Sequence, residues 1–316
     1  MKEIGGYFGL EAFAGNTYYP NGVAVNNARN ALLYILKLRN VNKLYIPSFL
    51  CDTVAELCKR EQYSYEEYRI DKNFLPVFDK ELEEDAWIYV VNYYGQITNK
   101  QIIKMQQRWS RVIIDNVQAF FQKPVSGVDT VYSCRKFFGV PDGGYAIVDK
   151  LLAESLPLDV SKDRMNHVLG RFEGCGSDYY MDFQNNDESF YELPLRKMSK
   201  LTENILRGID YESVRNRRNA NYAHLESALG KYNLLKLTAP DGPYCYPFYC
   251  ENGMEIKKRL AKEKIYGPTL WPNVLELEAS GLEKDYAANI LPLPVDQRYT
   301  GEDMDRIIEC LLPLLT

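Results

Sequence analysis

An acid and an amine lie close together in the middle of this 316-residue chain, the acid directly after a short apolar run and the amine three residues after the end of the next strand-like run. Asp115 ends the run 112–114, and Gln118 follows three residues later; Lys136 follows the run 131–133 and precedes a Pro-Asp-Gly-Gly turn. A lysine amine can form an imine with the aldehyde of pyridoxal phosphate (PLP), and a carboxylate can keep the pyridine nitrogen of that cofactor protonated. The residue types and their spacing therefore predict a PLP site.

Each residue also has an ordinary structural interpretation. A strand that ends in aspartate is common because turns favour this residue, and a lysine near a strand end is usually solvated. The two residues occur together at the ends of successive apolar runs, with the hydroxyl of Ser133 close to the lysine. This combination favours the chemical interpretation over the structural one.

The composition is that of an ordinary globular protein with about two domains. The net charge of −5 and the lack of a dense Lys/Arg run argue against nucleic acid as a partner. No apolar run approaches the ~20 residues of a spanning helix, and the Met-Lys-Glu-Ile start has no signal-peptide core. We therefore expect a cytoplasmic protein with neither a membrane nor a nucleic-acid partner.

The cysteines and histidines form no pattern typical of a metal site. The seven cysteines contain no Cys-x-x-Cys pair, which fits reduced thiols better than a disulfide framework or a zinc site. The two histidines, His167 and His224, lie in no metal-ligand spacing. We expect no bound metal, and acid–base work then falls to a lysine whose pKa is lowered by its surroundings.

Helix-like and strand-like runs alternate over the first 150 residues. Helical periodicity covers residues 27–38, 53–60 (with Asp52 as the expected N-cap) and 99–108. The strand-like runs are residues 43–49, 64–70, 86–93, 111–114 and 131–133. This alternation favours a mostly parallel sheet covered by helices, which binds ligands at the carboxyl ends of its strands. Asp115 and residues 133–136 fall at such ends.

The pattern changes after residue 151. Residues 151–195 look irregular and rich in tyrosine, and such a long segment inside a compact protein is more often functional or interfacial than idle. Thr300 and Asp303 form a capping box before the last helix. The other expected elements are helices over 196–207, 212–229, 254–264 and 302–312 and strands over 244–250 and 289–293. We expect a large domain of residues 1–205 and a small α+β domain of residues 206–316.

The order of the motifs resembles that of the DegT/DnrJ/EryC1/StrS-type aminotransferases, fold type I PLP enzymes that act mostly on nucleotide-linked keto-sugars. The similar segments are NGVAVNNARNAL (21–32), LYIPSFLCDTVAELC (44–58), VNYYGQ (91–96), IIDNVQAF (113–120), SCRK…DGG (133–144) and ILPLPVDQRY (290–299). The resemblance implies an α/β fold. Its large domain would hold a mostly parallel sheet of the seven-stranded type covered by helices, followed by a small C-terminal α+β domain.

The resemblance also implies roles for residues around the cofactor ring. Lys136 would carry the cofactor and shuttle protons, and Asp115 would face the pyridine nitrogen. Gln118 would lie near the phenolic oxygen of the ring, and Phe49 or Cys51 would lie against its face. Lys136 and Asp115 are thus the expected catalytic residues.

A second group of residues would hold the phosphate and the substrate. Ser133 and the backbone N–H groups around Ala28 and Arg29 would bind the phosphate, because a helix N-terminus offers unpaired N–H groups and a positive dipole end. Arg298 would bind the carboxylate of the amino donor, and Tyr94 would contact the substrate.

The chain departs from the pattern of the family at three places. Lys136 follows Ser133 by three residues, where the family usually has five. Residues 27–29 read Asn-Ala-Arg instead of a glycine with serine or threonine. In the segment 192–206, no asparagine precedes the arginine that would match an Asn-Tyr-Arg-Met-like stretch.

The implied function is a homodimeric PLP-dependent aminotransferase. It would move an amino group from glutamate or a similar donor to a carbonyl, such as a nucleotide-linked keto-sugar for surface polysaccharide. Two alternatives stay open: another PLP reaction on the same fold, such as elimination or decarboxylation, and a catalytically silent relative that binds a ligand or partner.

Overall fold

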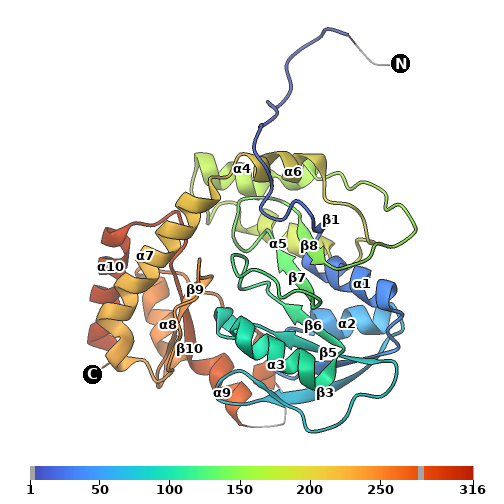
Figure 1. Ribbon diagram of the computed structural model, residues 1–316. Coiled ribbons are helices and arrows are strands. Elements are labelled where there is room, and N and C mark those ends of the chain that lie inside the picture. The colour runs from blue at the N-terminus through green and yellow to red at the C-terminus, as the bar shows by residue number, and fades with distance from the viewer. Residues whose placement is uncertain (1–3, 277–280, 316) are drawn as a thin grey trace.

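The computed structural model describes residues 4–276 and 281–315 (Figure 1). In this part of the chain, an eight-stranded sheet has the order β1-β8-β7-β6-β5-β2-β3-β4. Its strands are β1 (Val23–Val25), β2 (Lys43–Pro47), β3 (Ser64–Ile70), β4 (Pro76–Val77), β5 (Ala86–Val91), β6 (Val112–Asp115), β7 (Asp129–Ser133) and β8 (Gly144–Ile147). The central pairs are parallel, and the pairs that involve β1, β4 and β8 are antiparallel. The predicted α/β fold with a mostly parallel sheet is therefore confirmed; the sheet has one strand more than the seven-stranded type.

The register of the sheet brings several predicted site segments to one edge. Asp115 at the end of β6 pairs with Val131 on β7. Ser133 at the end of β7 pairs with Gly144 on β8, and Gly144 pairs in turn with Val25 at the end of β1. Strands β1, β6 and β7 run in the same direction, so their carboxyl ends meet at this edge.

Helices of the first half pack on this sheet, as Figure 1 shows. They are α1 (Ala28–Arg39), α2 (Asp52–Arg60) and α3 (Asn99–Trp109). Helix α1 contacts β7 and β8, and α3 contacts β6. The predicted N-cap of α2 was wrong by one residue: Asp52 is the first helical residue, and Cys51 is the N-cap. A carboxylate in the first turn still interacts favourably with the helix dipole.

The segment 151–195 is more regular than its sequence indicated. It contains α4 (Asn166–Glu173) and α5 (Tyr180–Ser189). The sequence of α5 does not show the periodicity typical of a surface helix, because some of its apolar residues, such as Met181 and Phe183, are exposed and do not lie on a core face. The next helix, α6 (Lys200–Arg207), begins four residues later than predicted, because Ser199 caps it by accepting a hydrogen bond from the Thr202 N–H.

The C-terminal part builds a second core around the antiparallel pair β9 (Cys245–Tyr249) and β10 (Ile290–Pro294). Its helices are α7 (Tyr211–Leu229), α8 (Gly253–Lys262), α9 (Leu282–Asn289) and α10 (Gly301–Leu311). Helix α9 was not predicted, whereas the capping box of Thr300 and Asp303 before α10 is confirmed. The predicted domain boundary after residue 205 falls inside α6 and stays a prediction.

The structure also gives two negative findings for residues 4–276 and 281–315. None of the helices there is long and apolar enough to cross a membrane. No group of three or more His, Cys, Asp or Glu side chains among these residues could hold a metal ion.

Candidate functional site

Asp115 is a buried carboxylate at the carboxyl edge of the sheet. Its Oδ2 accepts a hydrogen bond from the Tyr89 hydroxyl at 2.6 Å, and its Oδ1 accepts one from the Val117 N–H at 2.7 Å. Burial raises the pKa of Asp115, although both hydrogen bonds and the nearby charge of Lys136 oppose this rise. An ionised carboxylate has room for more than two donors, so a cationic N–H group would complete this site.

Lys136 lies in the turn that follows β7, and its side chain is exposed. Its Nζ is 5.7 Å from the centre of the Tyr244 ring. The ammonium is close enough to Asp115 to act on the pKa of that carboxyl. The structure therefore brings the predicted amine and the predicted acid to one region, with Tyr244 of the C-terminal part near the amine.

The backbone next to Lys136 is held by side chains from the C-terminal part of the chain. The carbonyl of Phe137 accepts a hydrogen bond from Gln297 Nε2 at 2.7 Å and one from Arg218 Nη2 at 3.2 Å. Arg218 is buried, and its Nη1 donates to the Pro243 carbonyl at 2.9 Å. Burial lowers the pKa of Arg218 to about 10.

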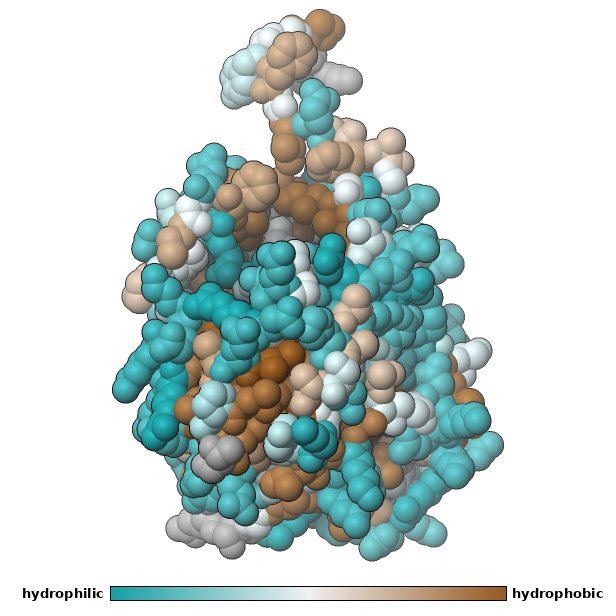
Figure 2. All heavy atoms as spheres, turned by 90° about the vertical axis from the view of Figure 1, so that its left-hand side faces the viewer, coloured by the Kyte–Doolittle hydropathy of each residue, from teal (hydrophilic) through white to brown (hydrophobic). Residues whose placement is uncertain are grey.

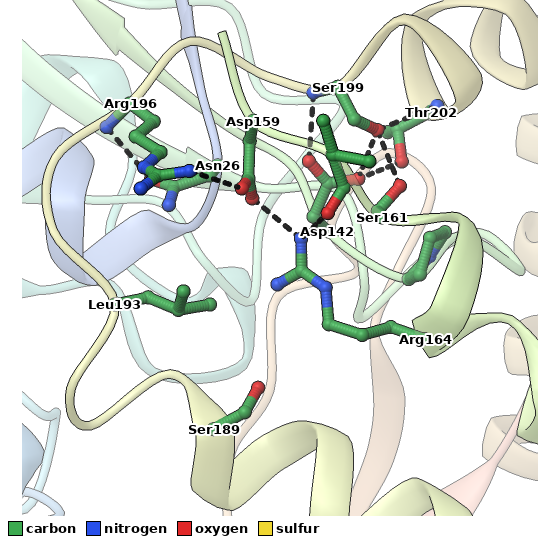
Figure 3. A network of polar contacts seen from close by, with 12 residues as sticks. Asn26, Asp142, Asp159, Ser161, Arg164, Ser189, Leu193, Arg196, Ser199 and Thr202 are labelled. Carbon is green, nitrogen blue, oxygen red and sulfur yellow. Dashed lines mark hydrogen bonds and ion pairs between the residues drawn. The ribbon is translucent and has the colours of Figure 1, made fainter. Parts of the chain in front are cut away.

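A second network binds the C-terminal end of the loop that carries Lys136 between β7 and β8, here called the lysine loop (Figure 3). Asp142 of the Pro-Asp-Gly-Gly turn is buried. Its carboxylate accepts hydrogen bonds from the N–H and the hydroxyl of Ser199, at 2.9 and 2.8 Å, and one from the Thr202 hydroxyl. Ser161 joins through a hydroxyl contact of 2.7 Å with Ser199. This network ties the lysine loop to the start of α6.

Next to that network, Arg164 and Arg196 interact with the carboxylate of Asp159, which is also buried. Arg164 Nη2 donates to Asp159 Oδ2 at 2.6 Å, and Arg196 Nη1 lies 3.8 Å from Asp159 Oδ1 (Figure 3). The backbone N–H of Arg196 also donates to Asn26 Oδ1 at 3.4 Å. These contacts link the segment before α4 and the segment before α6 to the chain just before α1.

The N-terminus of α1 reaches the same edge. Asn27 caps the helix: its side-chain oxygen accepts from the Asn30 N–H at 2.7 Å, while its Nδ2 is buried and has no hydrogen-bond partner among the described residues. Gly144 is needed for the close approach of β8, because a Cβ there would lie 2.7 Å from the backbone nitrogen of Ala28. Free helical N–H groups and a donor without an acceptor suit an anion such as a phosphate.

The residues at this edge therefore fit PLP at two of its ends. The α1 N-terminus with Asn27 suits the phosphate, and Asp115 suits a protonated pyridine nitrogen. Arg29, the second residue of α1, donates through Nη1 to the Phe190 carbonyl at 2.9 Å and stacks on Tyr191 at 4.3 Å. Its side chain thus binds the chain that follows α5, and its predicted role at a phosphate stays a prediction.

The residues expected near the cofactor ring lie in different surroundings. Cys51 caps α2, is half-buried, and its Sγ is 2.8 Å from the Thr53 hydroxyl. Phe49 is fully buried, with its ring 4.4 Å from that of Trp271. Ser133 is buried at the end of β7. Among Phe49, Cys51 and Ser133, only Cys51 has an intermediate exposure.

Gln118 and Tyr94 interact with each other. The side-chain oxygen of Gln118 accepts from the Tyr94 N–H at 2.8 Å. Tyr94 has a left-handed backbone with φ of 55°, which is uncommon for a residue other than glycine, and its side chain is buried. Gln118 therefore supports the turn after β5, and any contact of either residue with a ligand stays a prediction.

Arg298 lies after β10 with its guanidinium already paired. Its Nε and Nη2 donate to the two carboxylate oxygens of Asp296 at 2.6 and 2.9 Å. The side chain of Arg298 is exposed, whereas that of Asp296 is mostly buried. A substrate carboxylate would have to share this guanidinium with Asp296.

Four residues of the site were missed by reasoning from the sequence: Tyr89, Asn27, Arg218 and Gln297. Asn27 carried a signal, because asparagine directly before a periodic helix is a typical N-cap. Tyr89 lies in the middle of an apolar strand, where a tyrosine is expected to be core. Arg218 and Gln297 are 81 or more residues from the carbonyl that they bind, and nothing local in the sequence indicated this contact.

Comparisons with known proteins show a similarity of fold. No protein-family model matches the chain, and no curated protein matches it either. A DegT DnrJ EryC1 StrS aminotransferase from Brucella abortus is 16% identical, with a TM-score of 0.64 over 93% of this chain and 85% of that one. The sugar aminotransferase CalS13 from Micromonospora echinospora is 13% identical, with a TM-score of 0.62 over 92% and 86%. NtdA from Bacillus subtilis, with bound cofactor PMP, is 14% identical, with a TM-score of 0.66 over 93% and 73%.

These structures share nearly the full length of this chain's fold. At such low identity they show the fold of the type I PLP transferases, and they leave the reaction and the substrate to be argued from the site.

Proposed function

We propose that the chain is a PLP-dependent aminotransferase that binds its cofactor at the carboxyl edge of the sheet. The observation that carries this proposal is the buried carboxylate of Asp115, with room for a further donor, in the same region as the Lys136 amine. The unpaired Nδ2 of Asn27 at the start of α1 adds an anion-binding end. Together these groups match the charges of PLP.

In this proposal each residue of the site has its own role in binding the cofactor or moving a proton. When bound, PLP supplies an aldehyde for covalent attachment and a ring that accepts electrons. The Lys136 amine would be the attachment point, and it could also move a proton to or from the substrate carbon. Asp115 would accept a hydrogen bond from the protonated ring nitrogen and keep it protonated, and Tyr89 orients that carboxylate. The α1 N-terminus, Asn27 and Ser133 bind the phosphate.

We propose an amino acid such as glutamate as the donor and a keto-sugar attached to a nucleotide as the acceptor, in the synthesis of a polysaccharide. The support is the fold that the chain shares with structures described as sugar aminotransferases. We also propose that the functional unit is a homodimer. Elimination and decarboxylation use the same cofactor and the same fold, and the donor screen below separates them from transamination.

The exposed position of Lys136 favours a second candidate, a relative that binds a ligand without catalysis. A test with purified protein and added PLP distinguishes the candidates. For an aminotransferase, the protein turns yellow, bleaches with an amino donor, and carries a pyridoxyl group on Lys136 after borohydride reduction and peptide mapping.

The other results have equally definite meanings. A colourless protein that does not retain PLP supports the silent relative. Release of ammonia or carbon dioxide from the amino acid, without an aminated acceptor, supports one of the other PLP reactions. A screen of amino donors against keto-sugars in a single turnover then identifies the acceptor.

A further inference from the structure

A groove of about 520 Å³ lies between one face of α7 and the segment 239–241. Asn219, Tyr222 and Glu226 of the helix line it, at spacings of three and four residues that place side chains on one face. Helix α7 lies on the side of the molecule that faces the viewer in Figure 2, where hydrophilic residues surround a smaller apolar area. The volume falls in the range of small-molecule sites, roughly 300–1,000 Å³.

The charged side chains that line this groove are both acidic: Glu226 lies on the helix and Asp241 on the opposite wall. Asp241 Oδ1 accepts a hydrogen bond from Asn219 Nδ2 at 3.0 Å, and Arg215, outside the lining, lies 3.5 Å from Asp241 Oδ2. Glu226 Oε2 accepts from the Tyr246 hydroxyl at 2.7 Å, whereas its Oε1 has no donor among the described residues. The groove therefore offers carboxylate oxygens to a cation.

Tyr222 adds a buried polar group that the fold leaves without a partner. Its side chain lines the groove and is only 3% exposed, and its hydroxyl makes no hydrogen bond with any described residue. Burial raises the pKa of this hydroxyl, and the charge of the Glu226 carboxylate adds to the rise, so the two groups are near one another. A buried hydroxyl without a partner costs free energy, which a ligand that donates a hydrogen bond would recover.

We propose that this groove binds a linear aliphatic polyamine, with ammonium groups on Glu226 and Asp241 and methylene groups against the apolar part of the lining. Each wall carries one carboxylate, and Ala223, Ala239 and Pro240 supply the apolar contact. An ammonium has three donors and no acceptor, which suits carboxylate oxygens and an unpaired hydroxyl. A metal ion fits less well, because no group of three or more ligating side chains among residues 4–276 and 281–315 could hold one.

The segment 238–241, here called the strap, connects the groove to the turn after β5. Thr238 and Gln96 exchange two hydrogen bonds, at 2.9 and 3.0 Å. Pro240 packs on Gly95, where a Cβ would come within 2.9 Å of the proline ring. A ligand that binds both walls of the groove would therefore stabilise the contact between the C-terminal part and that turn. The groove uses none of the residues assigned to the cofactor, and the proposal does not rest on the proposed function.

Titration calorimetry on the full chain without cofactor tests the site, with the linear triamine spermidine as the probe. We expect saturable binding of one molecule per chain. Glu226→Gln and Asp241→Asn should each raise the dissociation constant by about tenfold or more, since each removes a charge-assisted hydrogen bond and keeps the shape of the side chain. Glu212→Gln is the matched control, because Glu212 is an exposed acid of the same helix outside the groove.

Two further comparisons distinguish this site from general attraction to an acidic protein. Butylamine, with one ammonium group, should bind at least about tenfold more weakly than spermidine, because it reaches only one of the two carboxylates. Spermidine should also raise the melting temperature of the native chain, as any ligand that binds only the folded state does, but not that of the Glu226→Gln, Asp241→Asn double variant. The melting temperatures without spermidine show whether each variant is folded.

The remaining outcomes would overturn the proposal. They are no saturable binding of spermidine, an equal loss of affinity in Glu212→Gln, and an unchanged dissociation constant in both groove variants. Asp115→Asn separates this site from the proposed cofactor site, whose buried carboxylate also suits a cation. Binding that survives in Asp115→Asn and is lost in the groove variants supports the groove, and the reverse pattern refutes it. Because no cofactor is present, a failure of the proposed function leaves this test intact.

Discussion

The acid and the amine of the candidate site lie near one another but are held in different ways. Asp115 ends a strand that is paired on both sides, and its carboxylate is bound by Tyr89 on the neighbouring strand β5 and by the N–H of Val117. Lys136 lies outside the strand ladder, in a turn whose backbone is bound by distant side chains. The sheet determines the position of Asp115, whereas contacts between remote parts of the chain determine the position of Lys136.

This difference has an energetic side. Burial raises the pKa of Asp115, so an ionised carboxylate at this position is energetically unfavourable when no cation binds it. In the lysine loop, by contrast, the residues around Lys136 are bound and its amine is exposed. Arg218 and Gln297 donate to the Phe137 carbonyl, and Ser199 before α6 donates to Asp142. We infer that the acid defines where a cofactor lies and that the loop determines how the amine reaches it.

The largest effect is expected from removal of the amine. Lys136→Ala should eliminate the pyridoxyl label that borohydride leaves on the native protein, because the variant has no amine at this position for covalent attachment. Peptide mapping by mass spectrometry measures the label. The fold should be unaffected, since the side chain is exposed. A label on Lys123 or Lys150 in the native protein would show that the amine has been assigned to the wrong loop.

The next effect comes from the acid. Asp115→Asn keeps an acceptor for the Val117 N–H and turns its Nδ2 donor towards the Tyr89 hydroxyl oxygen, but it cannot hold a pyridinium as a counter-ion. We expect half-transamination with an amino donor to slow by about a thousandfold or more, the loss seen when a charge aimed at the reacting centre is removed. Stopped-flow absorbance of the bound cofactor measures this rate, and a near-normal rate would refute the role of Asp115.

The same variant should be more stable than the native chain when both lack cofactor. The pKa of Asp115 is raised in the folded state, above an unfolded value of about 3.9. The folded state thus binds more protons than the unfolded state between these two values, and stability falls as the pH rises through that window. Asp115→Asn removes this fall, so its melting temperature should exceed that of the native chain by a few degrees at neutral pH. The difference should vanish at a pH below the unfolded value.

A change at Arg218 tests the remote contacts that bind the backbone next to Lys136. Arg218→Met should lower the free energy of unfolding by about 2–3 kcal/mol, because buried hydrogen bonds from a charged group to the Pro243 and Phe137 carbonyls are lost. Denaturant titration measures this change. Arg215→Met on the same helix is the control, since Arg215 makes a half-exposed contact of 3.5 Å with Asp241 and should matter little.

A double change shows whether Arg218 acts through the lysine loop. Arg218 and Gln297 share the Phe137 carbonyl, so the effects of Arg218→Met and Gln297→Ala on the rate of covalent PLP attachment should not add. Additive effects would mean that Arg218 stabilises the C-terminal part without positioning Lys136.

Much of the frame could be predicted from the sequence because its signals are local. Residues 64–70 form a strand with the predicted bounds, and the helix predicted over 27–38 is α1 shifted by one residue at each end. Asp115 was found in the same way, since a run of β-branched residues and a terminal acid are read directly. Its position at the carboxyl edge then followed from the parallel sheet.

The parts that could not be predicted depend on contacts between remote residues. Helix α5 has exposed apolar residues and no periodic core face, so its sequence resembled a loop. Asp142 was interpreted as a turn residue, although it is buried and binds the start of α6, 57 or more residues along the chain. Such a contact forms only after folding brings the two segments together, and no spacing rule indicates it.

The smallest expected effect concerns Arg298, which the sequence placed at the donor carboxylate and the structure places on Asp296. Arg298→Lys should change stability by no more than about 1 kcal/mol, because the pair is partly exposed. If Arg298 binds the donor, the variant should raise the KM for the amino acid about tenfold, since an ammonium cannot reproduce the planar fork. The spectrum of the bound cofactor should stay unchanged.

Asp296 makes this last test sharper. The two oxygens of Asp296 occupy the Nε and Nη2 donors that a substrate carboxylate would use, so the two carboxylates compete for one guanidinium. Asp296→Asn weakens the competitor and should therefore lower the KM for the donor if Arg298 binds it. Steady-state kinetics with the native chain and both variants decides the matter. Opposite shifts of KM in Arg298→Lys and Asp296→Asn assign Arg298 to the substrate, whereas an unchanged KM in both assigns the pair to the turn before α10.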